Sequence, residues 1–405
     1  MDLSFPKEYD GYREEVRQFL AGHWPPRGDA AKLPRKQQMT HFLSAAIERG
    51  YLARNVPRRY GGSEQPEDAV QATIIREEFT RAGAPRSALG NYMIMIPALL
   101  QFGTEWQREK FIRNAIIGVD TWCQGFSEPG AGSDLASLRT RAELVGDEWV
   151  ITGQKIWTTY AHISDYIFML VRTDPAAPKH QGISYLLVNM KQPGIEVRPL
   201  KQLSGDAEFN EVFFTEARAP KDWMVGEPGQ GWAVKSATLK AERTGSGGEP
   251  SMAMFDRVLK LARKATRNGA PAMRDPEVRQ WLANLEAMAV AHLYSGHRLL
   301  ARDAKGADPG PWAYMNKLYS TDFFAQEAMR IARELIGDDG LLLPRPRGID
   351  WPKYNDREIG DERWVSTMFT TLSYLIAGGT SNIQRNIIAE RGYGLPRDKD
   401  SGAGK

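Results

Sequence analysis

The spacing of apolar residues divides this chain into three parts. In the first part apolar residues recur every three or four positions, as at Tyr12, Val16 and Phe19, which is typical of amphipathic helices. In the middle part they alternate, or form short β-branched and aromatic runs between turn residues, which is typical of strands. In the last part the helical spacing returns. We therefore expect an α+β protein with an N-terminal α-helical domain, a middle β domain and a C-terminal helical domain at residues 1–120, 121–231 and 232–395.

Individual elements can be placed from the same pattern. Strands are expected over "EWVITGQKIW", "YIFMLVRT", "GISYLLVNM", "IEVRPL" and "NEVFFTEARAP". Long helices are expected over Trp232–Leu261, Pro276–Ala304, Trp312–Ile336, Glu362–Ile376 and Ser381–Arg391. The tail at residues 396–405 is expected to be disordered. No strand is followed by a G-x-G-x-x-G turn that opens a helix, so the sequence argues against a Rossmann fold.

Composition and charge narrow the class of protein. The 405 residues carry a net charge of +3 and no block of Lys or Arg, which argues against nucleic-acid binding. The single cysteine, Cys123, excludes an internal disulfide, lies in an apolar stretch that predicts a buried thiol, and suits a reducing cytosol. The histidines show no metal-ligand spacing, and neither a secretory signal nor a run of about 18 apolar residues is present. We therefore expect a cytoplasmic protein without a metal site or a membrane span.

Two neighbouring segments carry candidate chemistry. In "QGFSEPGAGSDLASL" (124–138), Pro129 and the glycines disfavour a regular element and expose successive backbone N–H groups, so the loop can approach a flat ring or a phosphate. A plain β-turn explains these residues equally well. In "ITGQKIWTTYA" (151–161), Trp157 ends a strand and two threonines follow it. Such a Trp is usually part of a core, but beside a glycine-rich loop it could form the wall of a flavin site.

Taken together, "CQGFSEPGAGSD", "GQKIWTT", "GISYLLV" and "GGTSNIQRNIIAER" resemble the acyl-CoA dehydrogenase family in order and spacing, over essentially the whole chain. The resemblance implies an N-terminal α-helical domain, a central antiparallel β domain and a C-terminal four-helix bundle, usually assembled as a tetramer. It implies an FAD-dependent enzyme that converts an acyl-CoA thioester to the trans-2-enoyl-CoA, with flavin N5 as hydride acceptor. An electron-transfer flavoprotein is the electron acceptor that such a resemblance implies.

The resemblance also assigns cofactor residues by position. The residues expected to border the isoalloxazine ring are Gln124, Phe126, Ser127, Gly132 and Ser133, the last also near the CoA arm. Trp157 is expected to stack beside the ring with Thr158 adjoining it, and Thr159 to reach the N5 edge. Thr380 and Asn382 are expected to meet the FAD phosphates from the last helix, which either Thr380 or Ser381 would cap.

The general base that this reaction needs is not at the position most common in the family. In much of the family a glutamate precedes Gly-Thr-Ser, but here that position is Gly378. In a minority of the family the base lies early in the C-terminal bundle, before an arginine, and Glu242-Arg243 in "ATLKAERTGSGG" matches that position. Read alone, a Glu in "KAER" is a surface residue paired with a lysine, but the resemblance and the vacancy at Gly378 favour catalysis.

Substrate contacts follow from the same assignment. Arg243 would hold the base region or a CoA group, although a salt bridge explains it equally well. Gly378 and Gly379 are expected to adjoin the thioester, and a backbone N–H near Gly378 to donate to its oxygen. The Met- and Ile-rich segment 90–103 either lines the acyl site or belongs to the core. The acyl group itself, whether straight, branched, dicarboxylic or steroid, cannot be read from the sequence.

Two departures from the family pattern concern subunit assembly. The Arg-x-x-Phe-Gly stretch that serves a neighbour's FAD is missing from "LARKATRNGAPAMRDPEVRQ", where only Arg263 and Arg267 are near. Asp338 and Asp339 stand where a neighbour's FAD phosphates would approach, and like charges repel. We therefore expect an α2β2 tetramer with a sister subunit, as in the large subunits of two-component acyl-CoA dehydrogenases of the pimeloyl-CoA and steroid side-chain types.

Two other readings share the fold. Flavin monooxygenases and nitroalkane oxidases need no glutamate at either base position, so Glu242 disfavours them. A non-catalytic, DNA-associated flavoprotein of the alkylation-response type would need a strongly basic C-terminal patch, whereas "GIDWPKYNDREIGDERW" is mixed to acidic.

Overall fold

The computed structural model describes residues 7–244, 248–303, 307, 310–337 and 361–396, without the side chains of 239–244, 303 and 361–363. The described residues form two compact units. The first unit holds the residues up to Glu242 apart from 203–206, and the second holds 203–206 and the residues from Arg243 onward. No helix in the described part is long and apolar enough to cross a membrane.

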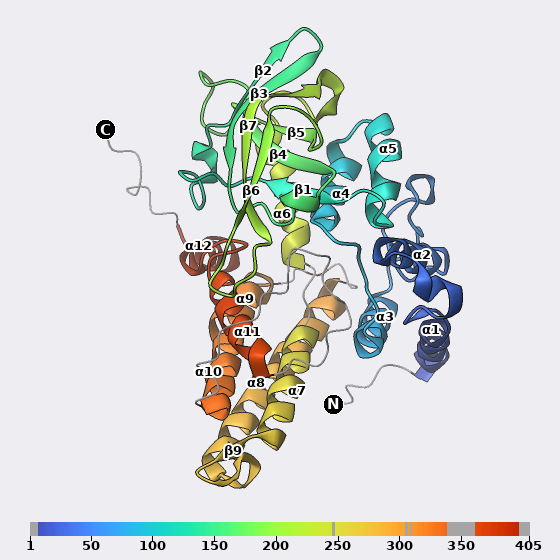
Figure 1. Cartoon of the computed structure of the whole chain (residues 1–405), viewed down its shortest axis with the longest axis vertical. Coiled ribbons are helices and arrows are strands. Elements are labelled where there is room, and N and C mark those ends of the chain that lie inside the picture. Colours follow the sequence, from blue (N-terminus) through green and yellow to red (C-terminus); the bar gives the residue numbers. More distant parts are fainter. Residues whose placement is uncertain (1–6, 245–247, 304–306, 308–309, 338–360, 397–405) are drawn as a thin grey trace. The chain divides into compact units, whose positions relative to one another are not determined.

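The first unit begins with five α-helices (Figure 1). They are α1 (Asp10–His23), α2 (Arg35–Glu48), α3 (Ala69–Ala82), α4 (Tyr92–Phe102) and α5 (Glu105–Ile116). Local sequence fixes several of their ends. Asp68 caps α3 by accepting a hydrogen bond from the Gln71 N–H, and Thr104 and Gln107 form a capping box at the start of α5.

An eight-stranded sheet follows in the order β6-β7-β3-β2-β4-β5-β8, with β1 paired to β4. Its strands are β1 (Trp122–Gly125), β2 (Arg141–Val145), β3 (Glu148–Lys155), β4 (Tyr166–Arg172), β5 (Ile183–Asn189), β6 (Ile195–Leu200), β7 (Phe209–Pro220) and β8 (Met224–Val225). The predicted strands appear as β3 to β7, while the short strands β1, β2 and β8 were not predicted because each has too few residues to show alternation.

The sheet corrects one detail of the expected fold. Most neighbours are antiparallel, as predicted, but β1 runs parallel to β4 and β2 meets β4 in parallel at one position, Arg141 opposite Arg172. The physical reason is the long connection between β1 and β4, which contains the glycine-rich loop and the β2–β3 hairpin. A connection of that length lets the chain return to the same end of the sheet before β4 begins.

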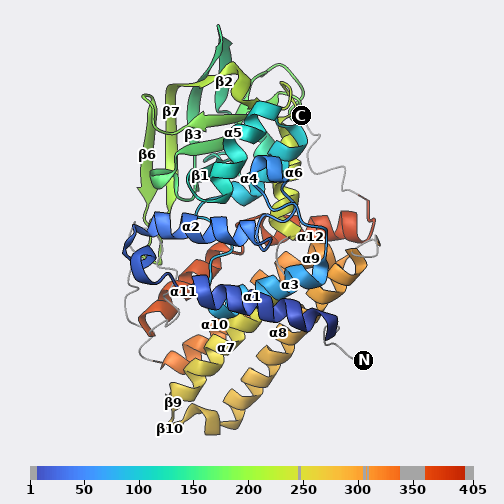
Figure 2. The same cartoon turned by 90° about the vertical axis from the view of Figure 1, so that its right-hand side faces the viewer.

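Helices α4, α5 and α6 (Gly231–Thr244) pack beside this sheet, as Figures 1 and 2 show from two directions. Phe111 of α5 meets the rings of Trp122 and Trp223 edge to face, with centroids 5.3 and 5.2 Å away. Helix α6 starts directly on β5: a Cβ at Gly231 would lie 2.6 Å from the Ser184 carbonyl carbon. A glycine is therefore needed where α6 meets the sheet.

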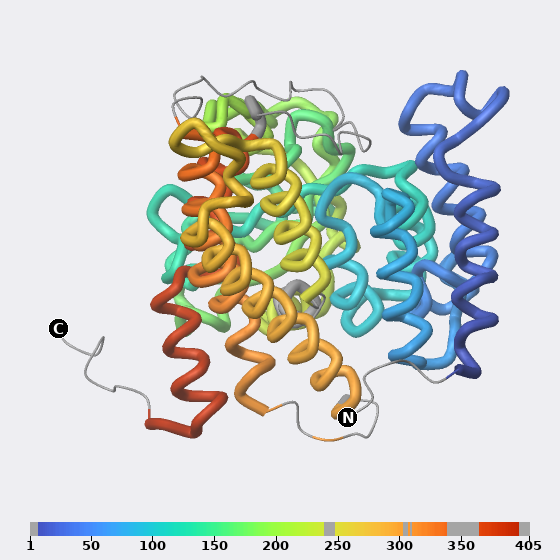
Figure 3. The backbone as a smooth tube through the Cα atoms, turned by 90° about the horizontal axis from the view of Figure 1, so that it is seen from below, coloured from blue at the N-terminus to red at the C-terminus, as the bar shows by residue number. Residues whose placement is uncertain are grey.

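The second unit is helical. It contains α7 (Glu249–Lys264), a short hairpin of β9 (Thr266–Arg267) and β10 (Ala270–Pro271), α8 (Pro276–Asp303), α9 (Trp312–Leu318), α10 (Ala325–Ile336), α11 (Asp361–Ser373) and α12 (Ser381–Ile387). Single π-helical turns follow α9 at Tyr319–Phe324 and α12 at Ile388–Gly392. Figure 3 traces the long helices of this unit as neighbouring tubes.

A separate hydrophobic core joins these helices, with Val258 of α7, Leu285 of α8, Ile331 of α10 and Trp364 of α11 all buried in it. The predicted helices therefore form, and the predicted fold class is confirmed. The pattern over Trp232–Leu261 corresponds to two helices rather than one, because Gly248 and Pro250 begin a new helix at α7.

Candidate active site

The glycine-rich segment, residues 126–133, is folded back on itself in a tight turn. The N–H of Glu128 donates to the Ala131 carbonyl and the N–H of Ala131 donates to the Glu128 carbonyl, both at 3.0 Å. The Ser127 carbonyl accepts from the Ile156 N–H at 3.0 Å, which ties the turn to the end of β3. A Cβ at Gly132 would meet no atom within 4 Å, so the backbone of this loop is uncovered on that side.

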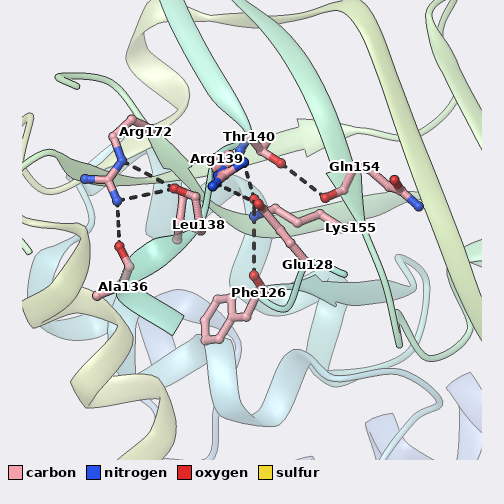
Figure 4. Close-up of polar contacts among 9 residues, drawn as sticks. All are labelled: Phe126, Glu128, Ala136, Leu138, Arg139, Thr140, Gln154, Lys155 and Arg172. Atoms are coloured by element: carbon pink, nitrogen blue, oxygen red, sulfur yellow. Dashed lines mark hydrogen bonds and ion pairs between the residues drawn. The ribbon is translucent and has the colours of Figure 1, made fainter. Parts of the chain in front are cut away.

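Glu128, itself part of this loop, fixes it to neighbouring segments (Figure 4). Its carboxylate accepts hydrogen bonds from the N–H groups of Arg139 and Thr140, at 2.6 and 2.9 Å, and from Lys155 Nζ at 2.8 Å. Lys155 Nζ also donates to the Phe126 carbonyl at 3.3 Å. One buried carboxylate thus joins the loop to the residues directly before β2 and to the last residue of β3.

Both members of this ion pair are removed from water. Burial lowers the pKa of Lys155 to about 8, against the opposing effect of Glu128. Burial alone would raise the pKa of Glu128, but Lys155 and the two backbone donors outweigh it and hold that pKa below its ordinary value. The pair therefore stays charged near neutral pH and fixes the loop without contributing a group that could reach a substrate.

The segment after β3 presents an aromatic ring to the outside. Trp157 is 58% exposed, has a left-handed backbone (φ 62°) and meets only the edge of Phe209 among the described rings, with centroids 6.1 Å apart. Buried Asn210 holds this conformation: its Nδ2 donates to the carbonyls of Thr158 and Glu208, both at 2.9 Å. Its backbone carbonyl accepts from the Thr158 N–H at 3.0 Å.

These residues fit a flavin. A large exposed ring held in a strained backbone conformation is unusual for a core residue but suits a wall for a flat cofactor. The Thr158 hydroxyl is buried and has no hydrogen-bond partner among the described residues, so a polar ligand edge would complete it. The open backbone at Gly132 leaves room for close approach.

The other residues predicted to border the ring lie on β1, on the glycine-rich loop and directly after Trp157. Gln124 lies on β1 opposite Phe168, and Phe126 is buried against the rings of Phe168 and Tyr185. Ser133 is exposed beside Gly132, and Thr159 is half-buried after Trp157. The loop and the Trp157 segment are joined at the end of β3, so the structure brings the two sequence motifs together.

The predicted base lies on α6. Val234 and Thr238 of this helix are buried, and the Thr238 hydroxyl is 3.5 Å from the Tyr185 hydroxyl of β5. Position 242 is one helical turn beyond Thr238 and so continues the same stripe of the helix. The side chains of Glu242 and Arg243 lie outside the described part, so their contacts remain predictions.

The glycine corner, Gly378–Gly379, lies between α11 and α12. Both residues have left-handed backbones, with φ of 66° and 100°. Gln384 Nε2 donates to the Gly378 carbonyl at 2.9 Å, and Lys317 Nζ donates to the Gly379 carbonyl at 3.0 Å. Thr380 caps α12 by accepting from the Ile383 N–H at 3.4 Å, which decides between Thr380 and Ser381 as the cap. Asn382 is exposed in the first turn of α12.

Several residues that shape the site were missed from the sequence. They are Glu128, Lys155, Asn210, Lys317 and Gln384. Glu128 and Lys155 stood inside quoted motifs, and a charged pair flanking a glycine-rich loop was a usable signal. Asn210 and Lys317 act through contacts far along the chain, which no local pattern reveals.

Of the residues that depart from the family pattern, Arg263 and Arg267 lie in the described part of the chain. Arg267 is bound to Asp275 and Glu277, at 2.8 and 2.7 Å, so it already has partners within its own unit. Arg263 is exposed near the end of α7. Asp338, Asp339 and the tail at 397–405 lie outside the described residues.

Other predicted positions are ordinary core or solvent residues. Cys123 is fully buried, and burial raises the pKa of its thiol to about 12, which fits the predicted structural role. Within 90–103, Tyr92, Met95 and Leu99 are buried in the core while Met93 is exposed. Among the described residues, no three His, Cys, Asp or Glu side chains are grouped as a metal site.

Comparison with known proteins identifies the family. Models of the acyl-CoA dehydrogenase N-terminal, middle and C-terminal domains match residues 6–118, 123–217 and 229–393. The chain belongs to the acyl-CoA dehydrogenase family. Members of this family are FAD-dependent oxidoreductases, so the flavin fit of the Trp157 segment agrees with the family's cofactor.

Relatives and solved structures agree along the whole chain. The acyl-CoA dehydrogenase IpdE1 of Mycobacterium tuberculosis is 39% identical, over 97% of this chain and 99% of its own. The ChsE4–ChsE5 complex from Mycobacterium tuberculosis has a TM-score of 0.77 at 28% identity, over 98% of this chain and 100% of that one. The steroid ACAD Tcur3481–Tcur3483 has a TM-score of 0.76 at 27% identity, over the same shares.

Proposed function

We propose that this acyl-CoA dehydrogenase family member removes the α proton of an acyl-CoA thioester with Glu242 and yields the trans-2-enoyl-CoA. Two positions support the assignment, one at the glycine corner and one on α6. The corner offers no carboxylate at Gly378, while α6 continues from its buried turn directly to Glu242. A carboxylate in a site shielded from water can serve as the general base for an α proton.

The cofactor would be held mainly by the first unit. Gly132 and Ser133 would approach the ring through an open backbone, Trp157 would stack against it, and the unpartnered Thr158 hydroxyl and Thr159 would meet its polar edge. Thr380 and Asn382 would meet the phosphates. When bound, FAD supplies the acceptor for the hydride that leaves the β carbon.

The chain's own residues would do the rest of the chemistry. Glu242 would accept the α proton, and Arg243 would hold the base region or a CoA group. The peptide N–H groups of the glycine corner would donate to the thioester oxygen as negative charge develops on it. Gly378 brings no carboxylate of its own, and two carboxylates at one site would raise each other's pKa.

The proposal is tested by Glu242→Gln. We expect FAD content and fold to be kept and anaerobic bleaching of the flavin by acyl-CoA to slow by about a hundredfold or more, the usual scale for a general base. Glu227→Gln, an equally conservative change at an exposed turn before α6, is the control and should bleach like the unchanged enzyme. Normal bleaching in Glu242→Gln would remove the assignment.

We also propose an α2β2 assembly with a sister subunit and an electron-transfer flavoprotein as acceptor. The first part is supported by the solved neighbours, because ChsE4–ChsE5 and Tcur3481–Tcur3483 are each named as pairs. Expression of this chain alone should give less than one tightly bound FAD per subunit. One FAD per subunit in a homotetramer would count against the sister subunit.

The acyl group is a separate question. Flavin bleaching by a panel of straight, branched, dicarboxylic and steroid acyl-CoAs would define it.

A further inference from the structure

A buried polar network lies in the second unit, where α7, α8 and α9 meet. His292 of α8 is 2% exposed, and both ring nitrogens have partners. Its Nδ1 is 2.8 Å from the Ser251 hydroxyl of α7, and its Nε2 is 2.5 Å from Asn316 Oδ1 of α9. Burial lowers the pKa of His292, so the ring is neutral near pH 7.

The partners define how the ring is used. A carboxamide oxygen can only accept, so Nε2 carries the proton and donates to Asn316, while Nδ1 accepts from the Ser251 hydroxyl. The residue types resemble a hydrolytic triad, but Ser251 is 4% and Asn316 6% exposed, so no substrate can reach the hydroxyl. The network is therefore a structural connection between three helices.

The network is joined to the start of α7 and, through α9, to the glycine corner. Gly248, six residues after Glu242, caps α7, and a Cβ there would lie 2.1 Å from the Leu293 nitrogen, so α7 begins directly on the His292 turn of α8. On the other side, Asn316 is followed by Lys317, whose Nζ holds the Gly379 carbonyl at 3.0 Å. Helix α9 therefore joins His292 to the glycine corner.

The orientation of the corner depends on those carbonyl contacts. A peptide group is planar and trans, so fixing a carbonyl also fixes the direction of the next N–H. Gln384 on the Gly378 carbonyl sets the N–H of Gly379, and Lys317 on the Gly379 carbonyl sets the N–H of Thr380. A donor on the carbonyl also polarises the amide and strengthens its N–H as a donor.

We propose that His292 is a positioning residue for the glycine corner, acting through Asn316 and the Lys317 side chain of α9. The inference rests on the proposed function only in assigning the corner's N–H groups to a thioester oxygen. The mechanical part, that His292 holds the corner in place, stands on the contacts within this unit.

The test compares variants by two independent readouts. Hydrogen exchange of the peptide covering residues 374–384, measured without substrate, reports how firmly the corner is held. Anaerobic flavin bleaching by acyl-CoA, with the substrate dissociation constant measured separately, reports its effect on chemistry. His292→Leu should raise exchange and slow bleaching by about tenfold or more, with FAD content and substrate affinity unchanged.

Two variants calibrate the result. His292→Gln can keep a donor toward Asn316 and should recover part of both readouts. Tyr319→Phe removes a different hydrogen bond to α8, from the Tyr319 hydroxyl in the π-helical turn after α9 to the Met288 carbonyl at 3.0 Å, and should leave both readouts unchanged. If His292→Leu does not fold, Asn316→Ala removes half of the network and should give the same changes in smaller measure.

The two readouts distinguish a failure of the positioning role from a failure of the proposed function. Unchanged exchange at 374–384 in the His292 and Asn316 variants would overturn the proposal, as would equal changes in Tyr319→Phe. If exchange rises as expected but no acyl-CoA bleaches even the unchanged enzyme, the positioning role stands and the proposed function fails.

Discussion

The glycine-rich loop of the first unit and the glycine corner of the second are both glycine-based turns, yet different interactions hold them. The loop is anchored by a buried ion pair, Glu128 with Lys155, which also satisfies two backbone N–H groups. The corner is held by side-chain donors, Gln384 and Lys317, on its two carbonyls. Because removing one partner of the ion pair leaves a buried charge unpaired, we expect its loss to unfold the loop. Each donor at the corner holds a separate carbonyl, so the loss of one should weaken the corner only in part.

The largest expected effect is on the loop. Lys155→Met leaves the Glu128 carboxylate buried without its cation, so we expect the free energy of unfolding to fall by about 3–5 kcal/mol and FAD to be lost. Urea denaturation measures this. The control is Lys179→Met: Lys179 pairs with Asp134 in the open, and its loss should cost about 1 kcal/mol or less. Equal losses would show that burial of the pair is unimportant.

A smaller effect is expected at Asn210. Asn210→Leu removes two donors from the carbonyls of Thr158 and Glu208, and leaving buried groups unpaired costs about 1–3 kcal/mol. We expect weaker FAD binding, measured by equilibrium dialysis of the flavin. Asn210→Asp keeps an acceptor but loses the donors, so it should be impaired as well; normal FAD affinity in both variants would separate the Trp157 segment from cofactor binding.

The corner should respond more mildly and in a different property. A Cβ at Gly379 would lie 2.8 Å from Gln384 Nε2, and the backbone there has φ of 100°. Gly379→Ala should therefore cost about 1–3 kcal/mol of local strain and slow flavin bleaching while FAD content is unchanged. Gly394→Ala shares a left-handed backbone but has no neighbour within 4 Å, so it controls for strain alone. Equal bleaching rates in the two variants would argue against the contact.

The smallest expected effect is a loss of stability at acid pH, which concerns the loop and its Glu128 carboxylate. The pKa of Glu128 is below its ordinary value in the folded protein, so its stabilisation is present above the unfolded pKa of about 4.5 and is lost as pH falls through the folded pKa. Unfolding midpoints in urea between pH 5 and pH 3 should fall more steeply in the unchanged protein than in Glu128→Gln. Parallel curves would contradict a depressed pKa at Glu128.

The sequence predicted what local chemistry determines. The helical, β and helical parts followed from periodicity, because this depends on neighbours in the chain. Residue type predicted a cap at Thr380 or Ser381, and the structure shows Thr380. Trp157 could be proposed as a flavin wall because its motif is contiguous. The flavin role of that Trp remains a proposal, although its exposure and backbone conformation support it.

Contacts between distant segments were not predictable. Lys155 fits the alternating pattern of its strand like any other residue. Only the fold shows that its ammonium group donates to the Phe126 carbonyl of the loop. Lys317 lies 62 residues before Gly379 in sequence, and nothing in "YMNKLYS" indicates a carbonyl partner. The parallel pairing of β1 with β4 was missed for the same reason, since register depends on where a long connection returns.

The most direct test of the account separates proton removal from hydride loss. A 3-thia-acyl-CoA has an α proton to lose but no β hydrogen, so exchange of its α proton with heavy water, followed by mass spectrometry, measures the base alone. With FAD bound, Glu242→Gln should exchange at least about a hundredfold more slowly than the unchanged enzyme, while Glu227→Gln exchanges normally. Exchange at the unchanged rate in Glu242→Gln would contradict the placement of the base on α6.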